Sequence, residues 1–350
     1  MSVKRNYICI NVIFIVASLL LLQTVQAQAD WSSLDQELKM KQKAMGNSLV
    51  VMVWKRGDTL VYKKELGEFN SKTPAPIGNA STWLTAALVM QFVDEGKLSL
   101  DDKITRWLPE FEKYGKNYIT LRLCLSHMTG ISDESKFLKK LFEKKKFSSL
   151  EDEVNSFAAR EIRTNPGTDF WYGDIGADIV GRVLEVVAKK KFDVLIKQKL
   201  FNPMTMRKSS FTTLDASALD PSGGASSTAD DYMKFLVMLL NNGTYAGKQI
   251  LSEASVKELL QIRTNSSIIK FAPKAAAGLN YALGSWAIEE ADGKATALSS
   301  LGLFGTWPVI DLCHGYASLI ITKDLQAEQK PDIWKSVKQT IDTQFPSTCQ

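Results

Sequence analysis

The chain has 350 residues, of which 45% are hydrophobic and 23% are charged. A chain of this length and apolar content can bury a large core, which excludes a disordered protein. Its formal net charge of +5 is too small to indicate a nucleic-acid-binding surface, so no nucleic-acid partner is expected.

The first 29 residues have the layout of a secretory signal peptide. Lys4 and Arg5 precede an apolar run over residues 7–22, and residues 27–29 read Ala-Gln-Ala, which suits cleavage. We therefore expect residues 30–350 to be secreted or periplasmic. Loss of the two leader charges lowers the net charge from +5 to +3. Retention of the leader as a membrane anchor is the alternative, and no other membrane contact is expected.

Export places the cysteines in an oxidising compartment, where disulfides persist. Cys124, Cys313 and Cys349 remain after removal of the leader, so they cannot all pair within one chain. Cys124 lies in an apolar stretch and is expected in the core. Cys313 and Cys349 both lie in the C-terminal part, where a strand and the tail can meet, and they are the candidate disulfide.

The first predicted elements are a helix and a β-hairpin. The helix is expected over residues 31–42. The apolar run 48–54 and its return 59–62 are joined by the turn residues 55–58. From residue 79 to about 260 the pattern is mostly helical, with breaks rich in Gly, Pro and Asp.

Strands return late in the chain, over residues 281–288, 306–311 and 316–322. A closing helix follows over 331–345. Two early strands, a helical middle and three late strands predict a mixed α/β fold of the α+β type, with one five-stranded antiparallel sheet flanked by helices. The sheet lobe would contain residues 45–75 and 275–345, and a mainly helical lobe would contain residues 79–270.

One basic cluster stands out, at residues 136–147. Its apolar residues recur at helical spacing, so its lysines would line the opposite face of a helix. We interpret this as a solvated helix face, and a surface-binding patch is the alternative.

Several stretches resemble, in order, the signature segments of the β-lactamase and penicillin-binding-protein superfamily of serine hydrolases. The stretch 120–131 is similar to that family's "LLSHTSG" segment, and 223–232 is similar to its "GG-x-x-STA-x-D" helix. The other matching stretches are 76–98, 100–109, 166–172 and 281–286. The resemblance extends over about residues 48–322 and implies a β-lactamase/transpeptidase-like fold.

In that family, Ser-x-x-Lys places a nucleophile at a helix N-terminus, with its lysine one turn later on the same face. The two matching positions here hold Asn79 and Thr82. The amide of Asn79 is not basic and forms no useful acyl-enzyme. Thr82 brings no positive charge that would lower the pKa of a neighbouring group.

The remaining family positions are only partly kept. In the Tyr-x-Asn motif the tyrosine is Tyr172, but the third residue is Asp174. Ser300 and Gly302 fall where the family carries Lys-x-Gly or His-x-Gly, so Ser300 replaces a group that usually binds a substrate carboxylate. With nucleophile, base and carboxylate clamp replaced together, no serine acyl-enzyme chemistry of the usual kind is expected.

The sequence holds other alcohols that could replace the family nucleophile. Ser81 would need a lysine at the position of Leu84, and it lies about 200° around the helix from Asn79. The Ser-x-x-Lys pattern at residues 267–270 lies far from the nucleophile helix and is interpreted as chance. Thr82 and Ser300 are the remaining candidates for a weak activity.

Tyr172, Asp174, Ser300 and Gly302 are the candidate ligand-binding residues. Tyr172 is either a packed, hydrogen-bonded aromatic residue or a ligand contact. The carboxylate of Asp174 favours a cationic or hydroxyl-rich ligand, whereas a helix-capping or solvent-exposed Asp174 is the structural alternative.

The two histidines do not indicate a metal site. His127 is expected to be a structural hydrogen-bonding residue, and His314 lies in a turn between two strands. No clustered carboxylates accompany them at ligand spacing, so no metal is expected. Phosphate-loop and dinucleotide fingerprints are absent from the sequence, so no cofactor is expected.

The sequence therefore predicts an exported β-lactamase-related protein whose active site has become a binding pocket. Its expected partner is a cell-wall peptide or a small-molecule ligand. The alternative is a weak serine hydrolase, acting as an esterase, carboxypeptidase or β-lactamase-like enzyme through a non-standard nucleophile. The oligomeric state is left open.

Overall fold

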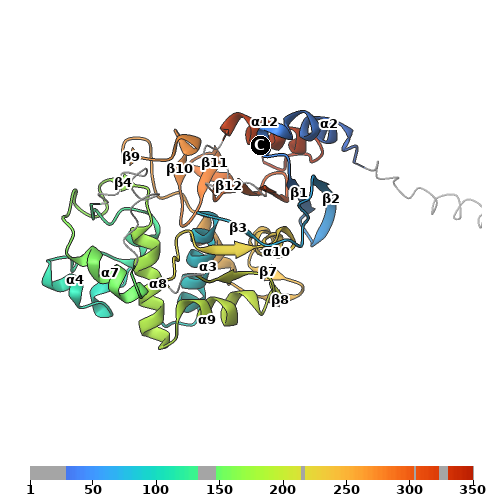
Figure 1. Ribbon diagram of the computed structural model, residues 1–350. Helices are drawn as coiled ribbons and strands as arrows, with labels where there is room; N and C mark the ends of the chain where they lie inside the picture. Colours follow the sequence, from blue (N-terminus) through green and yellow to red (C-terminus); the bar gives the residue numbers. More distant parts are fainter. Residues whose placement is uncertain (1–28, 133–146, 214–216, 303–304, 323–329, 350) are drawn as a thin grey trace, which may run out of the picture.

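The computed structural model describes residues 29–132, 147–213, 217–302, 305–322 and 330–349 (Figure 1). Nearly all of the expected signal peptide and most of the basic cluster at residues 136–147 lie outside the described residues. Among the described residues, none of the helices is long and apolar enough to span a bilayer.

One large antiparallel sheet brings the two ends of the chain together. Its strand order is β10-β11-β12-β13-β14-β1-β2. The strands are β1 (Leu49–Lys55), β2 (Thr59–Leu66), β10 (Asn280–Tyr281), β11 (Trp286–Ala291), β12 (Lys294–Ser299), β13 (Thr306–Asp311) and β14 (Tyr316–Thr322). Strand β1 pairs with β14 in a register that places Val51 opposite Ile320. The predicted antiparallel sheet is thus confirmed.

The sheet has seven strands, whereas five were expected. The segment 281–288 was expected to be one strand, but Gly284 adopts a φ of +84° and separates β10 from β11. The other missed strand is β12, which follows a tight turn at Asp292 and Gly293. Its sequence, Lys-Ala-Thr-Ala-Leu-Ser, holds two alanines and no aromatic residue, so its strand signal is weak.

The remaining elements are mostly helices, and several small strand pairs join them. The helices are α2 (Ser32–Lys41), α3 (Ala80–Asp94), α4 (Glu110–Lys113), α5 (Leu121–Leu125), α7 (Leu150–Ala158), α8 (Ile175–Ala188), α9 (Phe192–Ile196), α10 (Ala229–Leu240), α11 (Glu253–Leu260) and α12 (Pro331–Asp342). The short strands are β3 (Ala75–Pro76), β4 (Phe170–Trp171), β5 (Ser210–Phe211), β6 (Ala225–Ser227), β7 (Thr244–Tyr245), β8 (Lys248–Gln249) and β9 (Ile269–Phe271). The closing helix ends at Asp342, three residues before the expected end.

Both faces of the sheet are buried. Along β1, Val50 and Met52 join a core cluster that includes α3 and α10, while Val51 and Val53 join a second cluster that includes α2 and α12. In Figure 1, α2 and α12 lie together on one side of the sheet, and α3 and α10 lie on the other. A strand buried on both faces is apolar without alternation, as the sequence of β1 is.

A disulfide fastens the C-terminal tail to the sheet. The structure joins Cys313, in the turn after β13, to Cys349 near the end of the chain. The backbone N–H and the hydroxyl of Thr348 both donate to the Cys313 carbonyl. Cys124 is free and fully buried.

Beside this disulfide, a buried ammonium group holds α12 to the sheet. Lys338 of α12 donates to the carboxylate of Asp311 on β13 at 2.7 Å and lies 2.7 Å from that of Glu289 on β11. It also lies 3.0 Å from the carboxylate of Asp342. Asp311 is completely buried and the Lys338 side chain is only 5% exposed. The three carboxylates hold the pKa of Lys338 above its ordinary value although burial opposes this.

We expect Lys338→Met to destabilise the protein by about 3 kcal/mol or more, because removal of one partner leaves the completely buried carboxylate of Asp311 without its cation. Chemical denaturation measured beside the exposed Lys335→Met on the same helix would separate this effect from loss of a surface charge. Equal stability of the two variants would contradict the role given to Lys338.

Candidate functional site

The family positions identified in the sequence come together where three segments meet. These are the N-terminus of α3 with Asn79, the segment after β4 with Tyr172 and Asp174, and the end of β12 with Ser300 and Gly302. The hydroxyl of Ser300 donates to the backbone carbonyl of Asn79 at 3.1 Å, which ties the sheet to the start of the helix.

Asn79 occupies the nucleophile position and contacts Tyr172, the tyrosine of the family's Tyr-x-Asn motif. It is the N-cap residue of α3, yet its side chain makes no capping hydrogen bond. Instead it hydrogen-bonds the hydroxyl of Tyr172, which also receives a hydrogen bond from the indole of Trp286. Asn79 is 8% exposed, so this amide lies in a nearly closed environment.

Tyr172 lies in a cluster of aromatic side chains. Its ring centroid is 5.2 Å from that of Trp286, 6.0 Å from that of Tyr281 and 4.7 Å from that of His127. Phe170 completes the cluster from β4. Of the two sequence interpretations of Tyr172, the structure supports a packed and hydrogen-bonded aromatic residue, and it leaves the ligand-contact interpretation untested.

Thr82 lies one turn further along α3, where the family carries lysine. It is 3% exposed, and its hydroxyl donates to the carbonyl of Ser222 at 2.8 Å. Thr85 makes the matching contact to the carbonyl of Pro221 at 2.7 Å. Thr82 therefore fastens α3 to the loop before β6 and brings no charge to the site.

Ser81 faces away from Asn79, as its helical position predicts. It is completely buried, its hydroxyl donates to the Gly78 carbonyl at 2.6 Å, and it accepts from the backbone N–H of Ala225 at 3.0 Å. A nucleophile needs access to substrate, which this position lacks.

Gly302 allows the end of the sheet to approach the chain that enters α3. Its N–H donates to the carbonyl of Thr306 at 2.9 Å. A Cβ atom at this position would lie 2.5 Å from the carbonyl oxygen of Ile77, a distance that no ordinary contact reaches. Glycine is required here by this close approach between two backbones.

The charge of Asp174 acts on both Tyr172 and His127. Asp174 precedes α8, but its side chain makes no capping hydrogen bond to that helix. The helix-capping interpretation of this residue is therefore wrong. Burial, followed by the charge of Asp174, raises the pKa of Tyr172 above its ordinary value. His127 has its pKa lowered to about 4, because burial outweighs the opposite effect of Asp174.

Sequence reasoning missed the partners of Tyr172. His127 was expected to be structural, and its ring nitrogen Nε2 indeed lies 3.0 Å from the hydroxyl of Tyr281. Tyr281 and Trp286 were not predicted as site residues. Both lie in the stretch 281–286 that carries the family resemblance, so the signal was present in the motif itself.

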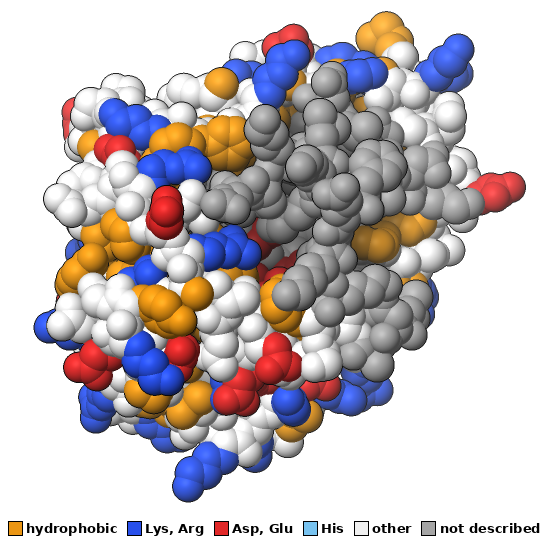
Figure 2. Space-filling view, turned by 60° about the vertical axis from the view of Figure 1, so that its left-hand side comes forward, with side chains coloured by type: hydrophobic (Ala, Val, Ile, Leu, Met, Phe, Trp, Pro, Cys, Tyr) orange, Lys and Arg blue, Asp and Glu red, His pale blue; other side chains and the backbone are white. Residues whose placement is uncertain are grey.

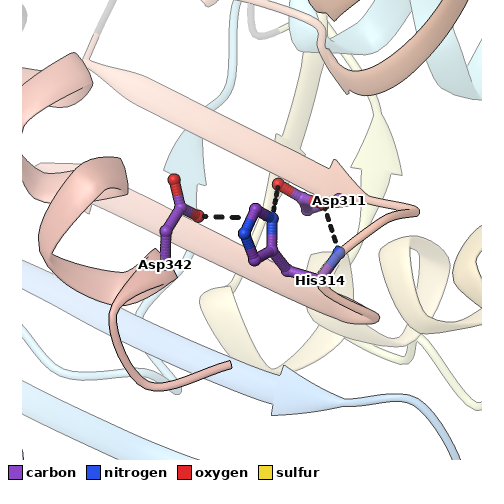
Figure 3. A group of neighbouring side chains, drawn as sticks. All are labelled: Asp311, His314 and Asp342. Carbon is purple, nitrogen blue, oxygen red and sulfur yellow. Dashed lines mark hydrogen bonds and ion pairs between the residues drawn. The ribbon is translucent and has the colours of Figure 1, made fainter. Parts of the chain in front are cut away.

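A separate group of residues has the composition of a metal site. Asp311, His314 and Asp342 offer ligand atoms that all lie within 4.8 Å of one another, and Figure 3 shows the imidazole between the two carboxylates. The ammonium of Lys338 already contacts both carboxylates. It supplies the positive charge that a metal ion would bring, so this group is best described as an ion-pair network that holds α12.

Comparison with known proteins places this geometry in a family. The β-lactamase family profile, described as "Beta-lactamase", matches residues 39–340. Among curated relatives, Protein Rv1367c of Mycobacterium tuberculosis is 25% identical over an alignment 265 residues long, and the match covers 59% of this chain and 66% of that protein. The chain thus spans just under two thirds of that relative's length.

Solved structures agree with the profile. A candidate β-lactamase from Bacteroides dorei superposes with a TM-score of 0.79 at 27% identity, over 90% of this chain and 98% of that one. EstCE1, a hydrolase with promiscuous acyltransferase activity, shares the fold with a TM-score of 0.73 at 18% identity, over 89% and 98% of the two chains. Because the family profile covers most of its length, this chain belongs to the β-lactamase family.

Proposed function

We propose that this protein is an exported, ligand-binding member of the β-lactamase family that does not form an acyl-enzyme. The observation that carries the proposal is the amide side chain of Asn79, which occupies the nucleophile position and hydrogen-bonds Tyr172. The lone pair of an amide nitrogen is delocalised into its carbonyl, so it does not attack an ester, amide or lactam.

The two positions from which the family draws its base, the lysine and the tyrosine, offer no base here. Thr82 is uncharged, and its hydroxyl proton is directed at the carbonyl of Ser222. The raised pKa of Tyr172 keeps its hydroxyl protonated at neutral pH, so a phenolate is not available to accept a proton. These features support binding without covalent chemistry.

The alternative is weak hydrolysis through Thr82 or Ser300. Thr82 and Ser300 are each 3% exposed, and the hydroxyl of each donates its proton to a backbone carbonyl. Neither contact activates an alcohol, because a carbonyl oxygen is a poor base. The geometry therefore favours the binding role over the hydrolase.

The charge of the site bears on the class of ligand. Asn79, Thr82 and Ser300 are neutral, and His127 is neutral at pH 7, whereas Asp174 is a carboxylate whose field reaches Tyr172. A carboxylate-bearing ligand would be repelled, so a cationic or hydroxyl-rich ligand is favoured. A cell-wall peptide with a free amine would satisfy this requirement.

Export is part of the proposal and rests on the leader pattern of residues 1–29. The bond between Cys313 and Cys349 supports it, because structural disulfides persist in oxidising compartments.

We expect no covalent adduct when the wild-type protein is incubated with a fluorophosphonate or a β-lactam and examined by intact-protein mass spectrometry. The Asn79→Ser, Thr82→Lys double variant, which restores both family residues, is expected to gain an adduct. A serine β-lactamase in the same experiment would show that the reagents are active. Labelling of the wild type would overturn the proposal, and the modified peptide would identify the nucleophile.

The negative charge of Asp174 predicts weak binding of carboxylate-bearing ligands. We expect benzylpenicillin to bind the wild type with a Kd above about 1 mM, and Asp174→Asn to strengthen binding roughly tenfold by removing the repulsion. Isothermal titration calorimetry would measure both, with the exposed Asp332→Asn as a control that leaves the Kd unchanged. Micromolar binding of this acid by the wild type would contradict the ligand class.

The neutral state of His127 has a measurable consequence. An imidazole titrates near pH 6.5 in an unfolded chain, so between about pH 6.5 and 4 the unfolded chain binds the extra proton and stability falls as the pH falls. We expect His127→Asn to remove about 2 kcal/mol of the stability difference between pH 7 and pH 5.

Asparagine suits this test because the backbone of His127 has a φ of 54°, which asparagine tolerates. Urea unfolding at the two pH values gives the difference for each protein independently of the absolute stability. An unchanged pH dependence in the variant would show that His127 titrates normally in the folded protein.

A further inference from the structure

A second surface lies on the opposite side of the segment that holds Tyr172. Successive side chains of an extended segment point to opposite sides. Phe170 and Tyr172 point into the aromatic cluster, so Trp171 points away from it. Strand β4 pairs in parallel with β9, and the N–H of Tyr172 donates to the carbonyl of Phe271 at 3.1 Å.

Trp171 and Phe271 form an aromatic platform on this second surface. Their rings are nearly parallel, at 19°, with centroids 6.5 Å apart. Phe271 is 45% exposed, so its ring presents an apolar face to solvent. The indole Nε1 of Trp171 is buried and has no hydrogen-bond partner among the described residues.

An arginine adds a positive charge to the platform. The guanidinium carbon of Arg163 lies 4.2 Å from the centre of the Trp171 ring. The guanidinium of Arg163 donates a hydrogen bond to the hydroxyl of Ser132 at 3.1 Å. Within the described part of the chain, no carboxylate forms an ion pair with Arg163. The neighbouring Lys270 lies 3.9 Å from the carboxylate of Asp169, so that pair is already balanced.

A small pocket adjoins the platform. Trp171 and His127 line it together with the backbone-rich stretches at Thr129 and Gly173. On the face drawn in Figure 2, acidic and basic side chains are interspersed and apolar side chains form only small groups. The small size of the pocket favours a small ligand.

We propose that the platform binds a sugar ring that carries a carboxylate. The apolar C–H face of a pyranose stacks on the exposed ring of Phe271. The planar guanidinium of Arg163 suits a carboxylate, to which it can donate two hydrogen bonds. This inference does not depend on the proposed function, because it concerns the other side of the 170–172 segment.

Two matched probes test this assignment. Methyl β-D-glucuronide and methyl β-D-glucoside have the same ring and differ in one carboxylate. By saturation-transfer NMR with the full mature chain, we expect the glucuronide to bind about tenfold more tightly than the glucoside. Arg163→Gln should abolish the preference, and Phe271→Ala should remove binding of both sugars. Both residues are exposed, so neither change threatens the fold.

The controls are Arg207→Gln and Val194→Ala, which change an exposed arginine and an exposed apolar residue elsewhere and should leave both affinities unchanged. Tyr172→Phe should also leave them unchanged, because Tyr172 points to the other side; loss of sugar binding in that variant would place the sugar in the family site and overturn the assignment. Three other results would also overturn the assignment. They are equal binding of both sugars, no binding of either sugar, and displacement of the glucuronide by an aromatic acidic peptide at a concentration below that of the sugar.

Discussion

Burial of helix α3 is the constraint on which the rest of the structure depends. Every residue from Ala80 to Phe92 is buried, so the helix must satisfy its polar side chains and its N-terminus entirely within the protein. The hydroxyl of Tyr232 donates to the carbonyl of Ala80, and those of Thr82 and Thr85 donate to the loop before β6. Because these contacts lock the rotation and depth of the helix, Asn79 is held at the point where sheet and helical lobe meet.

That constraint explains how the site can keep its shape without its catalytic residues. A buried lysine at position 82 would need a charged partner, whereas threonine meets its hydrogen-bonding requirement with one carbonyl of Ser222. Asn79 likewise retains a hydrogen bond to Tyr172 while it offers no nucleophile. These two replacements are neutral and hydrogen-bonded, so the site stays packed and loses the proton transfers that acyl transfer needs.

Much of the fold could be predicted, because long helices and apolar strands leave strong local patterns. The strand β12 could not, since its alanines carry little strand preference and its pairing with β11 and β13 is what makes it a strand. In the site, the sequence motifs predicted Asn79 and Tyr172. They did not predict the hydrogen bond from Trp286, because contacts between segments far apart in the chain depend on the packing of the whole sheet against α3.

The short extended segment at residues 170–172 couples two surfaces through one backbone. Because side chains alternate along this segment, Tyr172 points to the family site and Trp171 points to the outer platform. The backbone hydrogen bonds of the segment to His127 and to β9 fix both orientations together. A ligand that moved one of these side chains would have to shift this backbone and so disturb the other. Independent binding at the two surfaces therefore requires the segment to stay rigid, and the packing of Phe170 against Tyr281 and Trp286 provides that rigidity.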